Sequence, residues 1–374
     1  MALVVGEVRA GEENLEAVAE EGVSSDKSWS YLELWDHTTL YENEDNPVIQ
    51  KIKVIGRYHG QSYIIDSNRG SVTGWDDRRL RPGLAVSFFN QFRLVAEVNL
   101  NGFEDFDSQY IKGWDNVYVD WTINDDLKFR IGRQKSNTSR ERFTSSRFVL
   151  PFNRSRLVLQ STVDKVLGAS VYYNISDKIT VQTGIYSDLL DGKFARFENS
   201  GSVAALMKLG YKANEETQYY LDYWWSDRKE GSKEIRPYRH VLSLNSKSDW
   251  GKRGLITDLM YVSGNSVREG EETLGVVFMP WVRLTPKIRG VFRYHMALSN
   301  SEVGVDLQPR YETLAVTDGG GRAGKWYNSF YTGIDYQLNG EKLKVMAGIE
   351  YSNMSQGKND YSGWTQFLGI RTWW

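Results

Sequence analysis

Alternation of apolar and polar side chains runs through most of the sequence, and this period of two is the feature that most constrains the fold. In residues 342–351, for example, Leu343 and Val345 fall on one face and Lys342 and Lys344 on the other. Successive side chains of a β-strand point to opposite faces, so each such segment predicts a strand with one face against an apolar surface. No amphipathic helix of ordinary length interrupts the pattern, which argues against α/β folds.

About 16 alternating segments can be counted. Their approximate positions are 49–65, 75–88, 91–100, 115–123, 127–134, 164–174, 178–187, 202–211, 216–226, 237–247, 253–263, 272–283, 286–297, 326–337, 341–353 and 362–374. Short connections rich in Asn, Asp, Gly and Pro, the residues that tight turns need, alternate with longer polar ones. The longer connections are 66–74, 101–114, 135–163, 188–201, 227–236, 264–271, 298–325 and 354–361.

Short turns on one rim and long loops on the other are typical of outer-membrane barrels. The predicted fold is therefore all-β, a transmembrane antiparallel β-barrel of about 16 strands, with both termini on the rim of the short turns. No run of about 18 apolar residues occurs, so no transmembrane helix is predicted. The mean hydropathy of −0.50 suits a barrel because only alternate residues face lipid. A soluble sandwich, lectin or propeller is the alternative, but it has no reason to alternate its loop lengths.

The last strand resembles the C-terminal insertion signal of outer-membrane proteins. That signal has a terminal aromatic residue, a hydrophobic residue two places earlier and a glycine five places before the end. Trp374 and Gly369 match it, whereas Thr372 departs from it. The resemblance implies a bacterial outer membrane, with its lipid and the barrel-assembly machinery as partners. The acidic start has no basic region followed by an apolar run, so we expect a secretory signal to have been removed from this numbering.

Charge is concentrated in two regions of opposite sign. Residues 1–45 contain 12 acidic and 2 basic side chains, and residues 127–156 contain 9 basic and 1 acidic. We therefore divide the chain into an acidic, periplasmic and solvated extension, 1–45, and a barrel, 46–374. The basic region lies in a barrel that is otherwise electrically neutral. Two hypotheses follow: it lines the pore, or it is a solvated loop near anionic lipid head groups.

The basic region also contains the motif by which the chain resembles a known family. Gly132-Arg-Gln-Lys135, Arg142-Phe-Thr-Ser-Ser-Arg-Phe148 and Phe152-Asn-Arg-Ser155 are similar to the central motif of the phosphate-selective porin O and P family. Asn153 stands where an acidic residue is common, and residues 116–120 resemble the strand before the motif. The close match covers about 40 residues, and the rest agrees in strand pattern and terminal aromatic.

The resemblance implies a 16-stranded barrel that is usually a homotrimer, with an anion-favouring channel. By likeness to such porins, the third long loop, 135–163, is expected to fold into the lumen. Arginine there would suit phosphate and carboxylate through its paired donors. The candidate pore-lining residues are Arg133, Lys135, Arg142, Arg147 and Arg154 on the motif, Arg140 and Arg156 close to it in sequence, and Lys128 and Arg130 on the lumen face of the preceding strand.

No enzyme, cofactor or metal site is expected. The chain has no Cys, and its four His residues form no metal-binding or catalytic pattern. The basic residues occupy a single loop, so nucleic-acid binding is not expected. The predicted function is passive diffusion of small hydrophilic solutes, favouring phosphate or other small anions. The alternatives are a non-selective porin, or a structural or adhesive barrel protein with loops 188–201 and 298–325 as contact surfaces.

Overall fold

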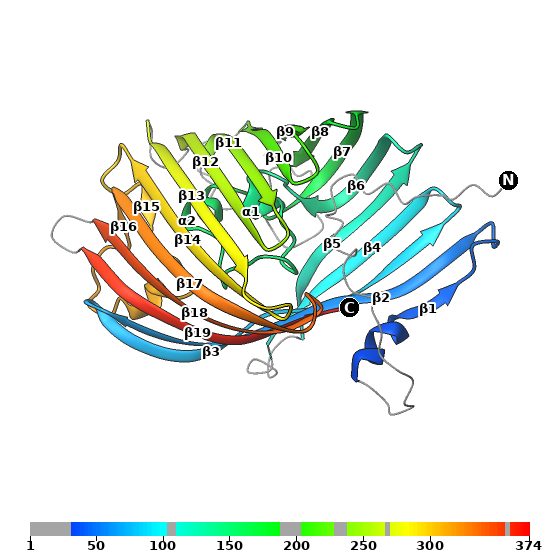
Figure 1. Cartoon of the computed structure of the whole chain (residues 1–374). Helices are drawn as coiled ribbons and strands as arrows, with labels where there is room; N and C mark the ends of the chain where they lie inside the picture. Colours follow the sequence, from blue (N-terminus) through cyan, green and yellow to red (C-terminus); the bar gives the residue numbers. More distant parts are fainter. Residues whose placement is uncertain (1–30, 103–109, 188–202, 228–237, 266–269, 356–359) are drawn as a thin grey trace.

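A single curved wall of strands surrounds the interior of the molecule in the computed structural model (Figure 1). The structure describes residues 31–102, 110–187, 203–227, 238–265, 270–355 and 360–374. The wall strands are β2 (Ile49–Ser67), β3 (Gly70–Phe88), β4 (Phe92–Leu100), β5 (Ile111–Thr122), β6 (Leu127–Lys135), β7 (Lys165–Ser176), β8 (Ile179–Ser187), β9 (Val203–Lys212), β10 (Thr217–Ser226), β11 (Tyr238–Asp249), β12 (Arg253–Asn265), β13 (Glu272–Arg283), β14 (Ile288–Ser299), β17 (Trp326–Asn339), β18 (Leu343–Ser355) and β19 (Tyr361–Trp373).

Every wall strand pairs antiparallel with its neighbours, and the wall closes where β19 pairs with β2. Within the described residues the main sheet has 17 strands; the short β1 (Thr39–Glu42) pairs near the start of β2, and the other 16 close the barrel. Closure leaves no free sheet edge, which is the condition for strands to cross a lipid bilayer. The predicted fold, an antiparallel barrel of about 16 strands, is confirmed.

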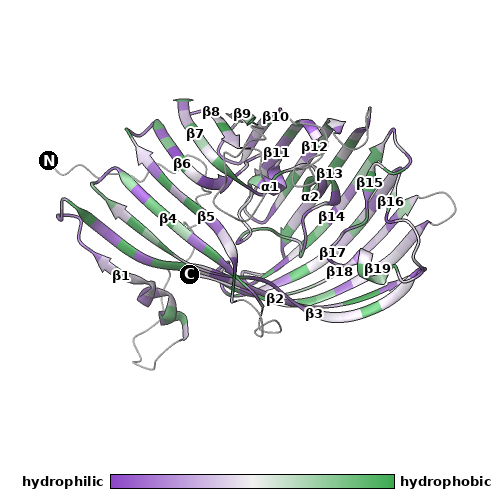
Figure 2. Ribbon diagram, turned by 180° about the vertical axis from the view of Figure 1, so that it is seen from behind, coloured by the Kyte–Doolittle hydropathy of each residue, from purple (hydrophilic) through white to green (hydrophobic). Residues whose placement is uncertain are grey.

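The two faces of the wall have the opposite polarity to that of a soluble protein. On β11, Leu244 is 54% exposed, whereas Ser243 next to it is fully buried. Leu244 lies between Leu221 of β10 and Leu259 of β12, which are also exposed. Figure 2 shows this alternation of hydrophobic and hydrophilic residues along many strands. Apolar side chains outward and polar side chains inward are what a barrel in lipid requires.

Two of the connections contain additional short elements. The segment between β6 and β7 contains α1 (Arg140–Phe143) and α2 (Arg156–Ser161). The segment between β14 and β17 contains β15 (Val305–Asp306), η3 (Glu312–Ala315) and β16 (Ala323–Gly324). Among the described residues, no helix is long and apolar enough to cross a membrane. The predicted loop 188–201 lies outside the described residues.

The predicted long loop 66–74 is wrong. Pairing of β2 with β3 continues to Ser67 and Gly70, and the chain turns at Asn68 and Arg69. Gly70 has φ of +138°, a conformation that side chains rarely adopt, and the Ser67 hydroxyl donates to its carbonyl oxygen at 2.7 Å. The polar residues of this stretch indicated a loop, but the inner face and the rim of a barrel are polar too.

The N-terminal region meets the C-terminus at the line where the barrel closes. Residues 1–30 of the predicted extension lie outside the described residues, and η1 (Tyr31–Thr38) precedes β1. The Trp35 indole N–H donates to the carbonyl oxygen of Trp373 at 2.6 Å. The backbones of Trp374 and Gly56 exchange two hydrogen bonds, and a side chain on Gly56 would collide with the Trp374 ring. These contacts fix the end of β19 against β2.

The outward face gives a direct test of the fold. Leu244→Arg should lower the free energy of unfolding by about 2–4 kcal/mol, because it places a charge near the middle of the lipid-facing surface. Leu284→Arg is the matched control, since Leu284 is 60% exposed in the turn between β13 and β14. Near the interface the same change should cost about 0–1 kcal/mol. Urea unfolding in lipid vesicles measures both, and equal losses would contradict the outward assignment of Leu244.

Candidate functional site

The segment between β6 and β7, residues 136–164, makes contacts with strands on different sides of the barrel. The backbone N–H of Ser139 donates to Asp222 of β10 at 2.9 Å. From β19, Arg371 donates to the carbonyl oxygens of Val149 and Phe152 at 2.7 and 3.0 Å. Because β10 and β19 lie almost opposite each other in the strand order, we infer that this segment, the crossing loop, passes through the inside of the barrel.

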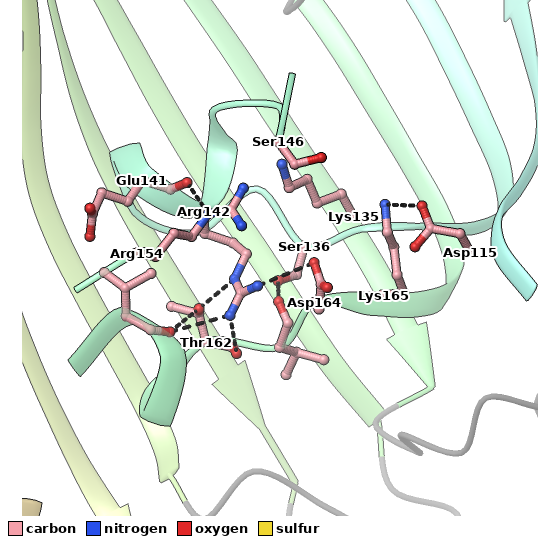
Figure 3. Close-up of polar contacts among 12 residues, drawn as sticks. Asp115, Lys135, Ser136, Glu141, Arg142, Ser146, Arg154, Thr162, Asp164 and Lys165 are labelled. Carbon is pink, nitrogen blue, oxygen red and sulfur yellow. Dashed lines mark hydrogen bonds and ion pairs between the residues drawn. The ribbon is translucent and has the colours of Figure 1, made fainter. Parts of the chain in front are cut away.

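Internal braces hold the crossing loop in shape, and several predicted site residues belong to them. Arg142 donates to the Thr162 hydroxyl at 2.7 Å and pairs with Asp164 at 3.2 Å, which joins α1 to the end of the loop (Figure 3). Burial opposes the charge of Asp164, but Arg142 and Lys165 outweigh it and hold the pKa of this carboxyl well below its usual range. The brace therefore persists at neutral pH and is lost only as the pH falls through that lowered pKa.

The other predicted residues also contact groups of the protein. Arg130 pairs with Asp120 at 2.6 Å, and Arg156 pairs with Asp306 at 3.3 Å. The remaining contacts are Lys128 over the Tyr172 ring, Arg133 to the Trp114 carbonyl, Lys135 to the Thr144 carbonyl, the backbone of Arg140 to Asp258, Arg147 over the Trp373 ring, and Arg154 to the carbonyls of Glu141 and Thr144. Most of the predicted basic side chains thus bind or stack on other residues of the chain.

Four arginines instead gather around one small cavity. They are Arg78 and Arg79 of β3, Arg154 of the crossing loop and Arg371 of β19, and we call them the arginine cluster. Ser146 and Phe152 complete most of the lining, and no carboxylate among the described residues contributes to it. The cavity therefore lies where the crossing loop meets the wall near the closure of the barrel.

A β-bulge explains how two consecutive arginines reach the same side of β3. Asp76 pairs with Gln61 and Arg79 pairs with His59, so three steps along β3 correspond to two along β2. The extra residue changes the phase of the alternation, and Arg78 and Arg79 both line the cavity. On its other side His59 pairs with Arg371. Three basic side chains thus stand in one row across three neighbouring strands.

Neutral groups are the hydrogen-bond partners of the arginine cluster. Arg78 donates to the Asn153 side-chain oxygen, and a nitrogen of Arg79 lies 3.3 Å from His59 Nδ1. Arg154 and Arg371 donate to backbone carbonyls. Among the described residues none of the four has a carboxylate within ion-pair distance. Arg79 and Arg371 flank His59 from the two sides of β2, so two positive charges lie near each other without a carboxylate, and a bound anion would offset their repulsion.

The pKa of Arg154 reflects its buried position beside other charged groups. Burial, followed by the charge of Arg142, lowers the pKa of the Arg154 guanidinium below its ordinary value, although Asp164 and Glu141 act in the other direction. A guanidinium stays protonated at neutral pH. The positive charge of the cluster is therefore present under the conditions in which a channel works, in surroundings that exclude much of the water that would screen it.

Sequence reasoning identified Arg154 and missed the rest of the arginine cluster. Arg78 and Arg79 lie in a predicted strand, where strict alternation allows just one of them to face inward. Arg371 stands alone near the C-terminus. A usable signal was the run Arg78-Arg79-Leu80-Arg81, which is unusual in a strand with one face in lipid.

If Arg142 braces the crossing loop, its removal should lower stability, whereas a residue that contacts solutes directly should mainly change permeation. Arg142→Ala should lower the free energy of unfolding by about 1–3 kcal/mol, because it leaves Thr162 and Asp164 without their donor. Lys212→Ala is the control, since Lys212 and Glu215 form an exposed pair worth about 0–1 kcal/mol. Urea unfolding measures the loss, and bilayer recordings report the anion preference. Unchanged stability with lost phosphate block would instead make Arg142 a solute-contacting residue.

Comparisons with known proteins agree with this architecture. Similar solved structures include the outer-membrane channel DcaP of Acinetobacter baumannii (12% identity, TM-score 0.58, covering 90% of this chain and 100% of that chain). OmpF of Salmonella typhi is also similar (12%, 0.61, 90% and 100%), as is a trimer form of OmpT of Vibrio cholerae (12%, 0.56, 86% and 99%). At this identity the likenesses show the fold. A comparison with curated protein sequences gives no match.

The family comparison matches the model described as phosphate-selective porin O and P. It spans less than half of the 374 residues, but it includes Arg78, Arg79, Arg154 and the whole crossing loop. Family and fold together support an outer-membrane channel. The resemblance predicted from the central motif is thus confirmed: over residues 60–230 this barrel matches the phosphate-selective porin O and P family.

Proposed function

We propose that the protein is a bacterial outer-membrane porin for small hydrophilic solutes, and that it favours anions because of the arginine cluster. The observation that carries the proposal is the cavity lined by Arg78, Arg79, Arg154 and Arg371, with no carboxylate in its lining among the described residues. The nine residues predicted from the sequence contribute Arg154 to that cavity.

Physical chemistry favours anions at such a place. A group of fixed positive charges in a narrow, partly desolvated passage lowers the energy of an anion and raises that of a cation. Guanidinium groups also offer paired donors that match the oxygens of phosphate and carboxylate. Phosphate is therefore one candidate solute, and small carboxylates are equally compatible with the four arginines.

A second candidate function, a structural or adhesive barrel, is favoured by the packing of the interior. Arg140, Phe152 and Leu157 of the crossing loop are all at most 2% exposed. A loop packed this closely fills much of the cross-section near it. Steady single-channel conductance of the purified protein supports the porin, and the absence of conductance supports the structural protein.

We also propose a homotrimer, in line with the family and with the trimer form of the similar OmpT. A barrel with apolar side chains around its outer face can bury part of that face against neighbouring barrels as well as lipid. Chemical cross-linking in detergent and native mass measurement would detect three chains in the assembly. A single chain under both conditions would contradict the trimer.

Arg79 gives the sharpest test of anion preference because its described partner is His59, another basic residue. Removing one charge about 8 Å from an ion changes its energy by about 2 kcal/mol at an effective dielectric constant of about 20, before screening by salt. Arg79→Gln should therefore reduce the chloride-to-potassium permeability ratio several-fold and weaken block by phosphate. Arg79→Lys, which keeps the charge, should retain most of the anion preference.

Reversal potentials in planar bilayers under a KCl gradient measure this ratio. Arg253→Gln is the matched control, since Arg253 is exposed at the short-turn end of β12 and stacks on Trp250. We expect that variant to keep the wild-type reversal potential. A cation-selective wild-type channel, or equal shifts for Arg79→Gln and Arg253→Gln, would refute the role of the arginine cluster.

A further inference from the structure

A second connection, residues 300–325 between β14 and β17, also enters the interior of the barrel. The Tyr311 ring packs edge-on against Phe367, with centroids 5.2 Å apart, and Phe367 is the central residue of β19. The Tyr311 hydroxyl accepts a hydrogen bond from the Gln61 side chain of β2, and Tyr311 is 1% exposed. We call residues 300–325 the second inner loop, because they reach the middle of the wall from inside.

The second inner loop is bound to the crossing loop along α2. Arg156 donates to the Asp306 carbonyl oxygen at 2.6 Å, and its guanidinium pairs with the Asp306 carboxylate at 3.3 Å. Gln160 donates to the Gly304 carbonyl oxygen at 2.7 Å and accepts from the Asp306 backbone N–H at 3.1 Å. Arg156 and Gln160 are both buried, so separating the two loops would leave buried polar groups without partners.

Apolar packing joins the two loops as well. Leu157 of the crossing loop and Leu307 of the second inner loop belong to one buried hydrophobic cluster. Phe152 of the crossing loop stacks on Phe367 with centroids 5.0 Å apart, so this ring contacts both Phe152 and Tyr311. Close-packed interiors leave few voids larger than a water molecule. The two loops therefore form one block inside the barrel, and solutes have to pass beside it.

The tip of the second inner loop is fixed to the turn between β2 and β3. The Arg69 guanidinium pairs with Asp318 at 2.6 Å and donates to the Gly321 carbonyl oxygen at 2.6 Å. The backbone N–H of Thr317 donates to the Arg69 carbonyl oxygen at 3.2 Å. Hydrogen bonding from Arg69 lowers the pKa of Asp318 to about 2, so this pair is lost only as the pH falls through that value.

We propose that the second inner loop is a size-limiting element of the channel, which braces the crossing loop and narrows the passage beside it. Barrels of 16 strands are wide enough to leave an aqueous channel, and a block built from two loops takes up part of that width. This inference rests on the proposed function, because it concerns the width of the same channel. The arginine cluster acts on the charge of a solute, whereas the second inner loop acts on its size.

Shortening the second inner loop tests the proposal. Replacing residues 308–321 by Asn-Gly leaves Leu307 and Arg322 beside a two-residue hairpin turn, and their backbones already form a hydrogen bond of 2.7 Å. We expect single-channel conductance to rise, and the uptake of a neutral disaccharide relative to a neutral pentose to rise several-fold. Liposome swelling measures both uptake rates, and neutral sugars report size without the charge effect of the arginine cluster.

Tyr311→Ala tests the same role with a single substitution. It removes the ring that packs on Phe367, so the sugar ratio should rise in the same direction by a smaller factor. Glu302→Ala is the control in the same connection, because Glu302 is 79% exposed and pairs with Lys325. We expect this variant to keep the wild-type ratio.

The measurements separate this inference from the proposed function. Wild-type sugar ratios in both the shortened loop and Tyr311→Ala, in a channel with anion-selective reversal potentials, would refute the size-limiting role and leave the anion-favouring porin standing. A conducting wild type without anion preference would refute the role of the arginine cluster, and the sugar ratios would still decide the size-limiting role. A wild type without conductance would refute both.

Thiol labelling keeps the proposal testable if the shortened loop does not insert into the membrane. The chain has no Cys, so Leu314→Cys and Ala315→Cys each introduce a single thiol. Leu314 is 45% exposed and Ala315 is fully buried, so a maleimide should label the first variant many-fold faster in intact vesicles. Both should label alike in urea. Equal labelling in the native protein would contradict a loop that is fixed inside the barrel.

Discussion

Hydrogen bonding of the backbone in lipid is the constraint on which the rest of this structure depends. A strand edge exposed to hydrocarbon would leave N–H and C=O groups without partners, so the sheet must close. Closure happens where β19 pairs with β2, and the contacts of Trp373 and Trp374 fix that line. Once the outer face is given to lipid, every charged side chain of the strands has to lie inside or at a rim.

Charges forced into the interior mostly neutralise one another there. Examples of such pairs within the wall are Arg57–Glu97, Arg130–Asp120, Lys208–Asp222 and Arg289–Asp335. Against this pattern, the four arginines of the cluster line one cavity that has no carboxylate in its lining among the described residues. An anion inside the barrel would supply the opposite charge, which is the basis of the proposed anion preference.

The sequence predicted the barrel well because the alternation is a local property. Each strand such as β18, with Val345 outward and Lys344 inward, shows its two faces without reference to any other strand. The predicted loop at 66–74 was wrong because a polar hairpin at the rim has the composition of a loop. Prediction of the site was weaker. A basic motif shows that charge is concentrated, but it does not show which residues Asp164 or Asp306 neutralise.

Register decides which arginines remain unneutralised, and register is not visible in one sequence. The bulge that brings Arg78 and Arg79 to the same face appears when β3 is paired with β2. Arg371 joins them because β19 closes the barrel against His59. These neighbours are far apart along the chain. The motif contributes Arg154 to the cavity, and the wall strands contribute the other three arginines.

The most direct test of an anion site in this cavity is anomalous diffraction from crystals of the full chain soaked in bromide. The account predicts an anomalous peak between Arg79, Arg154 and Arg371, and its loss in crystals of Arg79→Gln. Bromide found at exposed arginines of the rim, with none in the arginine cavity, would contradict the claim that the arginine cluster binds anions.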